Sequence, residues 1–98
     1  MLGDMRRCRV YQAIDIMDLN TAVDDLGVIH VDDGKWKIFL PETNTERIVV
    51  SFEPDVEPWY AADSIVRFTC FLQIAGFTVS VLRGQQEVEL SESDGTIH

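Results

Sequence analysis

The Asp33-Gly34 pair between two apolar runs constrains the fold more than any other feature of the sequence. An Asp-Gly pair between two runs of β-forming residues is typical of a type I′ turn, because both central residues of that turn need positive φ. The pairs that this turn creates are Val31 with Trp36 and Ile29 with Ile38. A three-residue loop would instead set Val31 and Ile29 opposite lysines and mix the two faces. The sequence therefore predicts a tight hairpin over residues 28–40 with one apolar face.

A third strand is predicted over residues 47–53, where polar and apolar side chains alternate. A turn over residues 41–45 separates it from the hairpin. Pro54 and Pro58 bracket an acidic loop after it, and this loop cannot continue the strand because proline lacks a backbone N–H.

A helix is expected from Trp59 to Ala75, ended by Gly76. Its core stripe has helical spacing and consists of Ala61, Ile65, Phe68, Leu72 and Ala75. Strands at 78–83 and 87–90, joined by a turn at Gly84, complete the ordered chain.

The N-terminal part gives a weaker pattern. Residues 8–14 fit a strand or the lead-in to a helix, and propensity favours the strand. Residues 15–26 have helical period, which predicts a helix that Gly27 ends. Its apolar side would hold Ile16, Leu19, Val23 and Leu26, and its outer side Asp18, Thr21, Asp24 and Asp25.

This order of elements predicts an α+β fold, with a mixed or antiparallel sheet of about five strands and two helices packed on one face. Strands 47–53 and 78–83 are expected to pair in parallel across the second helix. We expect residues 1–90 to form a single compact domain and residues 91–98 to form a flexible acidic tail.

Charge is the most unusual part of the composition. Seventeen Asp and Glu face eight Lys and Arg, which gives a net charge of −9. Such a chain should repel nucleic acid and anionic membranes and be attracted to basic surfaces, although solubility alone is also a sufficient reason for the charge. The N-terminus lacks the apolar run of a secretory signal, and no stretch is long enough to cross a bilayer, so we expect a cytoplasmic protein with Cys8 and Cys70 as thiols.

Motifs for catalysis or cofactor binding are not found in the sequence. His30 and His98 have no partner at zinc-ligand spacing, and no glycine-rich phosphate loop or serine elbow is present. Exposed carboxylates seldom acquire the raised pKa that general acid catalysis needs. The sequence therefore predicts a non-enzymatic protein with no metal and no cofactor.

Two surfaces remain as candidates for binding. The acidic candidate consists of Asp18, Asp24, Asp25, Asp32, Asp33, Glu53, Asp55 and Glu57. The apolar and aromatic candidate consists of Trp59, Tyr60, Val66, Cys70, Phe71 and Ile74. The simpler interpretations are a solvated acidic surface and ordinary core packing, and core packing is the expected role of Trp36.

The leading functional hypothesis is a stoichiometric inhibitor that docks on a basic, nucleic-acid-handling protein, with its carboxylates in place of phosphates. Small acidic phage antagonists of host defence, including anti-CRISPR proteins, share this physical profile, as do antitoxins and immunity proteins. The alternative is a structural or regulatory subunit that acts through an apolar interface, such as a homodimer.

Overall fold

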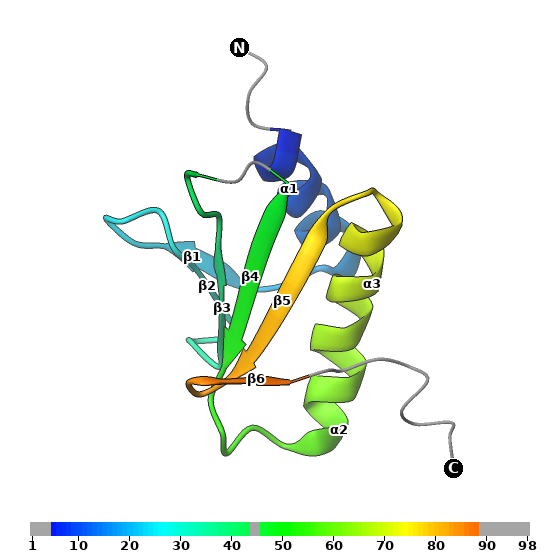
Figure 1. The fold of residues 1–98 in the computed structure, drawn as a ribbon. Helices are drawn as coiled ribbons and strands as arrows, with labels where there is room; N and C mark the ends of the chain where they lie inside the picture. Colours follow the sequence, from blue (N-terminus) through cyan, green and yellow to red (C-terminus); the bar gives the residue numbers. More distant parts are fainter. Residues whose placement is uncertain (1–4, 44–45, 89–98) are drawn as a thin grey trace.

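The computed structural model describes residues 5–43 and 46–88. Figure 1 shows a twisted sheet with its helices packed against it. The elements in chain order are α1 (Met5–Met17), β1 (Thr21–Val23), β2 (Ile29–Val31), β3 (Trp36–Phe39), β4 (Arg47–Phe52), α2 (Pro58–Tyr60), η2 (Ala61–Ile65), α3 (Val66–Ile74), β5 (Thr78–Arg83) and β6 (Gln86–Val88).

The sheet has six strands in the order β1-β2-β3-β4-β5-β6. Neighbouring strands are antiparallel except β4 and β5, which pair in parallel from Arg47 with Thr78 to Phe52 with Arg83. A parallel pair needs a long crossover, and the helix between β4 and β5 supplies it. The predicted α+β class, the mixed sheet and the parallel pair are confirmed, and β1 is the additional strand.

The predicted hairpin has the expected register, with Val31 opposite Trp36 and Ile29 opposite Ile38. The turn covers residues 32–35, and Asp32, Asp33 and Gly34 all have positive φ, of 53°, 61° and 86°. The positive φ predicted at Asp33 and Gly34 is confirmed, and Asp32 adds a third left-handed residue that the Asp-Gly signal did not indicate. The Lys35 N–H donates to the Asp32 carbonyl at 3.3 Å and closes the turn.

The core lies between the sheet and the helices. Its largest fully buried side chain is Trp36, which packs edge-to-face on Phe68 with ring centroids 5.1 Å apart. The other face of β2, β3 and β4 is only half-buried, as expected for a sheet covered on one side.

The second helix runs from Pro58 to Ile74 and includes the π-helical turn η2, which the sequence did not indicate. Its predicted stripe is buried except at Ala75, which is exposed. The end is a Schellman motif, in which the Gly76 N–H donates to Gln73 O at 3.0 Å and the Phe77 N–H to Leu72 O at 3.1 Å.

The predictions for the N-terminal part are wrong. Residues 8–14 are helical, and α1 ends at Met17, so no helix covers residues 18–26. The reason is Asp18, whose φ of 56° ends the helix in the way that glycine usually does. The Asp18 N–H donates to Asp15 O and the Leu19 N–H to Ile14 O. The chain then enters β1, so the acidic helix face predicted from Asp18 to Asp25 does not exist.

The correct helical stripe was present a few residues earlier in the chain. Val10, Ala13 and Ile14 are buried, while Ile16 and Leu26, which were predicted to face the core, are 66% and 88% exposed. Arg6 is also buried, and its guanidinium donates to the carbonyls of Pro41 and Arg47 at 2.7 and 3.0 Å. These bonds attach the start of α1 to the sheet.

The last predicted strand is seen as β6, Gln86–Val88. Residues 89 and 90 of that strand, residues 44 and 45 of the predicted turn and the predicted tail lie outside the described residues. None of the helices in the described part of the chain is long and apolar enough to cross a membrane.

Candidate functional site

A chain of polar contacts begins in the core and reaches the surface at the β2–β3 turn. The indole N–H of buried Trp36 donates to the Tyr60 hydroxyl at 2.9 Å. The Tyr60 hydroxyl donates in turn to the Asp32 carboxylate. These contacts join the hairpin to the start of the second helix and fix the position of the Tyr60 ring.

The Tyr60 ring is half-buried, and this burial raises the pKa of its phenol, with the hydrogen bond to Asp32 adding to the effect. The ammonium of Lys35 lies 4.9 Å from the ring centroid, within the range of a cation–π contact. Trp59 packs edge-to-face on the same ring, with centroids 6.0 Å apart. Tyr60 is therefore the centre of a small aromatic and charged cluster.

The acidic loop at residues 53–57 is held beside this cluster by the neighbouring strands. The Glu53 N–H donates to Lys35 O at 3.3 Å, and the Arg83 guanidinium donates to Pro54 O at 2.9 Å. Gly84 has a φ of 66°, and a Cβ there would lie 3.1 Å from Cγ of Pro54. The β5–β6 turn thus needs glycine both for its backbone and for its contact with the loop.

The loop and the cluster together form a hollow of about 300 Å³. Its lining includes three carboxylates from the loop, together with Lys35, Val56, Trp59 and Tyr60. Trp59, which belongs to this lining, is 68% exposed. We define the acidic–aromatic end as Asp32, Lys35, Glu53, Asp55, Glu57, Trp59 and Tyr60.

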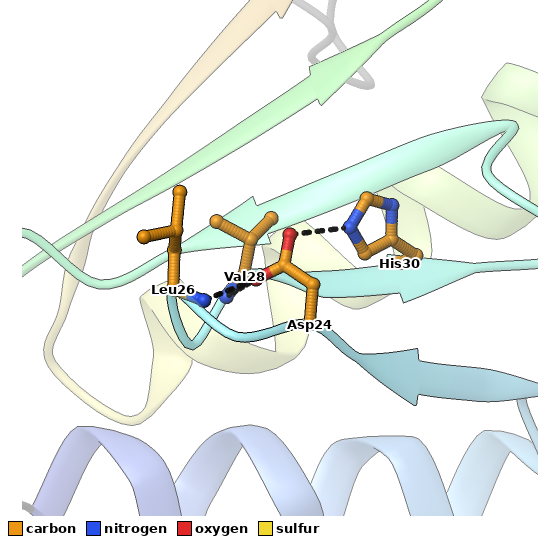
Figure 2. Close-up of polar contacts among 4 residues, drawn as sticks. All are labelled: Asp24, Leu26, Val28 and His30. Atoms are coloured by element: carbon orange, nitrogen blue, oxygen red, sulfur yellow. Dashed lines mark hydrogen bonds and ion pairs between the residues drawn. The ribbon is translucent and has the colours of Figure 1, made fainter.

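Asp24 has a different role from these acids, as Figure 2 shows. One carboxylate oxygen accepts the N–H groups of Leu26 and Val28, at 2.8 and 3.1 Å, and the other contacts His30 Nε2 at 2.9 Å. The bond to His30 is the main cause that lowers the pKa of Asp24, and the two backbone bonds lower it further. Asp24 therefore builds the β1–β2 turn.

The remaining acidic candidates do not join the acidic–aromatic end. Asp25 is exposed in the β1–β2 turn, at the opposite end of β2 from Asp32. Asp33 lines a separate hollow with His30 and Thr21. Asp18 is the residue that ends α1. The structure thus groups four of the eight acidic candidates in one place.

Four of the apolar candidates lie together on the helices, away from Trp59 and Tyr60. Val66, Cys70, Phe71 and Ile74 line an open groove of about 660 Å³ between α3 and α1. The rest of its lining comprises Ala75 and Arg67 from the second helix and its end, and Arg9, Ile16 and Met17 from α1. We call this the α1–α3 groove. The sequence missed its α1 side because α1 was not predicted there.

The acidic–aromatic end has the properties of a binding site for a cation. An exposed indole suits stacking of an arginine or lysine side chain, and the surrounding carboxylates supply the opposite charge. Over residues 5–43 and 46–88, no group of three or more His, Cys, Asp or Glu side chains is placed to hold a metal ion.

Comparison of the chain with protein-family models, with curated proteins and with solved structures finds no match.

Proposed function

We propose that this chain is a non-enzymatic binding protein that docks its acidic–aromatic end on a basic surface of a protein partner. The observation that carries the proposal is the exposed Trp59 in one hollow with Glu53, Asp55 and Glu57. An arginine of the partner would stack on the indole and pair with a carboxylate at the same time. Tryptophan is one of the residue types that dominate binding hot spots.

The side chains and the loop of the acidic–aromatic end are held in place by specific contacts, which distinguishes this end from a patch of freely moving acidic side chains. Tyr60 is fixed by Trp36 and Asp32, and the loop is fixed by Lys35 and Arg83. Side chains and loops that are already ordered lose less conformational entropy on binding. The acidic–aromatic end is therefore preorganised, and a partner that binds there would lose little affinity to the ordering of this surface.

The partner we propose is a protein whose basic surface handles nucleic acid. A net charge of −9 speeds association with such a surface. Carboxylates placed against lysines and arginines that normally contact phosphates would exclude the nucleic acid, so binding would act as stoichiometric inhibition. Small acidic phage antagonists of host defence, anti-CRISPR proteins among them, share this physical profile.

The test is affinity capture from a lysate of the host cell, with the tagged chain as bait and washes at low and high salt. One variant carries Glu53→Lys, Asp55→Lys and Glu57→Lys in the acidic–aromatic end. The matched control carries Asp15→Lys, Asp25→Lys and Glu42→Lys, three exposed acids outside it with the same change in net charge. Circular dichroism checks that both variants fold.

We expect a basic nucleic-acid-handling protein to be retained by the wild type and by the control, and lost from the Glu53/Asp55/Glu57 variant. High salt should also release it, because at 1 M the Debye length falls to about 3 Å. Equal loss from both variants would show that only overall charge matters. A partner that resists both high salt and the triple reversal would contradict the proposal.

A further inference from the structure

The α1–α3 groove is a second surface, independent of the acidic–aromatic end. It has an apolar floor, and several of its side chains are open to solvent, with Ile74 87% exposed, Ile16 66% and Phe71 37%. Exposed apolar residues gathered in one concave place mark an interaction site more often than residues scattered singly.

Charge on this groove is opposite in sign to the charge of the protein. Arg9 from α1 and Arg67 from α3 belong to its lining, and none of the described residues of the lining is a carboxylate. Among the described residues both arginines have weak local contacts, since Arg9 donates to Gln12 at 3.2 Å and Arg67 lies 3.7 Å from the exposed Asp63. Exposed contacts of this kind contribute little to stability, so a partner carboxylate can replace them.

The shape of the groove selects the kind of occupant. A groove between two neighbouring helices accepts a convex rod, and a third helix packs on such a pair by placing its ridges of side chains into the groove. An amphipathic helix that docks in an apolar groove is a common mode of peptide recognition. A lipid surface is broad and flat, and fits a concave groove less well.

A second copy of the chain fits less well for electrostatic reasons. Two copies that face each other through this groove would bring the arginines of both linings into one interface, and the described part of the lining has no carboxylate to pair with them. Like charges in an interface oppose association. The charge therefore favours a partner of different composition.

We infer that the α1–α3 groove binds an amphipathic helix of another protein, with apolar residues toward the groove and acidic residues beside them to pair with Arg9 and Arg67. This surface would let the chain hold a second protein while its acidic–aromatic end stays exposed. The inference does not depend on the proposed function, because it involves none of the same residues.

The experiment is a selection from a displayed library of 14-residue helical peptides. Apolar positions at helical spacing vary among Leu, Ile, Phe and Met, and the flanking positions vary between Glu and Lys. The library is selected separately on the wild type, on the double variant Arg9→Glu/Arg67→Glu and on Ile74→Asp. Arg9, Arg67 and Ile74 are exposed, so these changes leave the core in place.

We expect Glu-flanked peptides on the wild type and Lys-flanked peptides on the double variant, each bound about tenfold more tightly than its opposite, which corresponds to about 1.4 kcal/mol. Ile74→Asp should reduce binding of both classes. A selected peptide should also slow chemical modification of half-buried Cys70 in the groove and leave exposed Cys8, which is outside the lining, unchanged.

Several results would overturn the inference. Failure to select any peptide would contradict the binding of a helix in the groove. Equal affinity for peptides with Glu and with Lys at the flanking positions would contradict the proposed pairing of acidic residues with Arg9 and Arg67. Unchanged modification of Cys70 would place the peptide elsewhere. A dimer at micromolar concentration in light scattering, disrupted by Ile74→Asp, would assign the groove to a second copy. Binding to vesicles of phosphatidylserine and phosphatidylcholine, with no peptide selected, would assign it to a membrane.

Discussion

Tyr60→Phe tests whether the Trp36–Tyr60–Asp32 contacts hold the hairpin to the second helix. The change removes one oxygen and leaves the ring. Trp36 is 0% exposed, so its indole N–H would lose the acceptor at 2.9 Å in a place that water does not reach. A buried donor without a partner costs about 1–3 kcal/mol. We expect Tyr60→Phe to lower the free energy of unfolding by about 2 kcal/mol, which lowers the melting temperature of a domain of this size by roughly 10 °C.

A double-mutant cycle separates this cost from other effects of losing the hydroxyl. In a Trp36→Phe background the indole N–H is already gone, so Tyr60→Phe should cost about 1 kcal/mol less than it does in the wild type. Urea unfolding followed by circular dichroism gives all four free energies of unfolding. If Tyr60→Phe costs the same in both backgrounds, to within about 0.4 kcal/mol, the two side chains are not coupled. The Trp36–Tyr60 hydrogen bond would then not account for the loss of stability.

The same residue predicts how stability depends on high pH. The pKa of the Tyr60 phenol is raised in the folded protein, first by burial and then by the bond to Asp32. The contribution of the neutral Tyr60 phenol to the free energy of unfolding is fully present below the ordinary tyrosine pKa of about 10. This contribution is lost as the pH rises from there through the raised pKa of the folded protein. The stability of Tyr60→Phe should fall less steeply above pH 10. An identical alkaline slope would contradict this assignment.

Three further predictions concern single side chains. Thr69 is 4% exposed, and no partner for its hydroxyl is found in the part of the chain that the structure describes. Thr69→Val should therefore raise the free energy of unfolding by about 1 kcal/mol, measured by thermal unfolding. Thr69→Ser keeps the hydroxyl and should not stabilise the domain. Gly84→Ala should destabilise by about 1–2 kcal/mol, because of the positive φ and the close approach to Pro54, and an unchanged urea midpoint would argue against that contact. The pKa of Asp24 is lowered, so its support for the β1–β2 turn is present above about pH 4 and lost as the pH falls through its folded pKa. Protection of the Leu26 and Val28 amides from hydrogen exchange should fall over that range in the wild type, and should be low and independent of this titration in Asp24→Ala.

The sequence predicted the elements whose side chains carry an unambiguous period. The hairpin register follows from a single apolar face, which forms when Val31 lies opposite Trp36 and Ile29 opposite Ile38. The helix end at Gly76 follows from a residue that adopts positive φ without strain. In both cases, local residues were sufficient.

The N-terminal helix was predicted wrongly because two apolar stripes with helical spacing follow one another in the sequence. One runs through Val10, Ala13 and Ile14, and the other through Ile16 to Leu26. Only the first stripe is buried. Aspartate reaches the left-handed region more readily than most residues, but nothing in the local pattern marks Asp18 as the point where the helix stops.

Only part of the candidate site was predicted, namely the part whose residues are close together in the sequence. Glu53, Asp55, Glu57 and Trp59 are neighbours in sequence, so their grouping follows from a short loop. The contribution of the hairpin turn depends on β3 pairing with β4, which brings distant parts of the chain together. Sequence alone gives no strand order, and for this reason Lys35 was missed.

Docking of the acidic–aromatic end on a basic protein can be followed at Trp59 by fluorine NMR of the 5-fluorotryptophan protein. The sequence has two tryptophans, of which Trp36 is buried and Trp59 is exposed. Titration with the captured partner should shift or broaden the Trp59 resonance and remove its solvent isotope shift, while the Trp36 resonance stays in place. Saturating binding that leaves the Trp59 resonance and its isotope shift unchanged would contradict docking through this end.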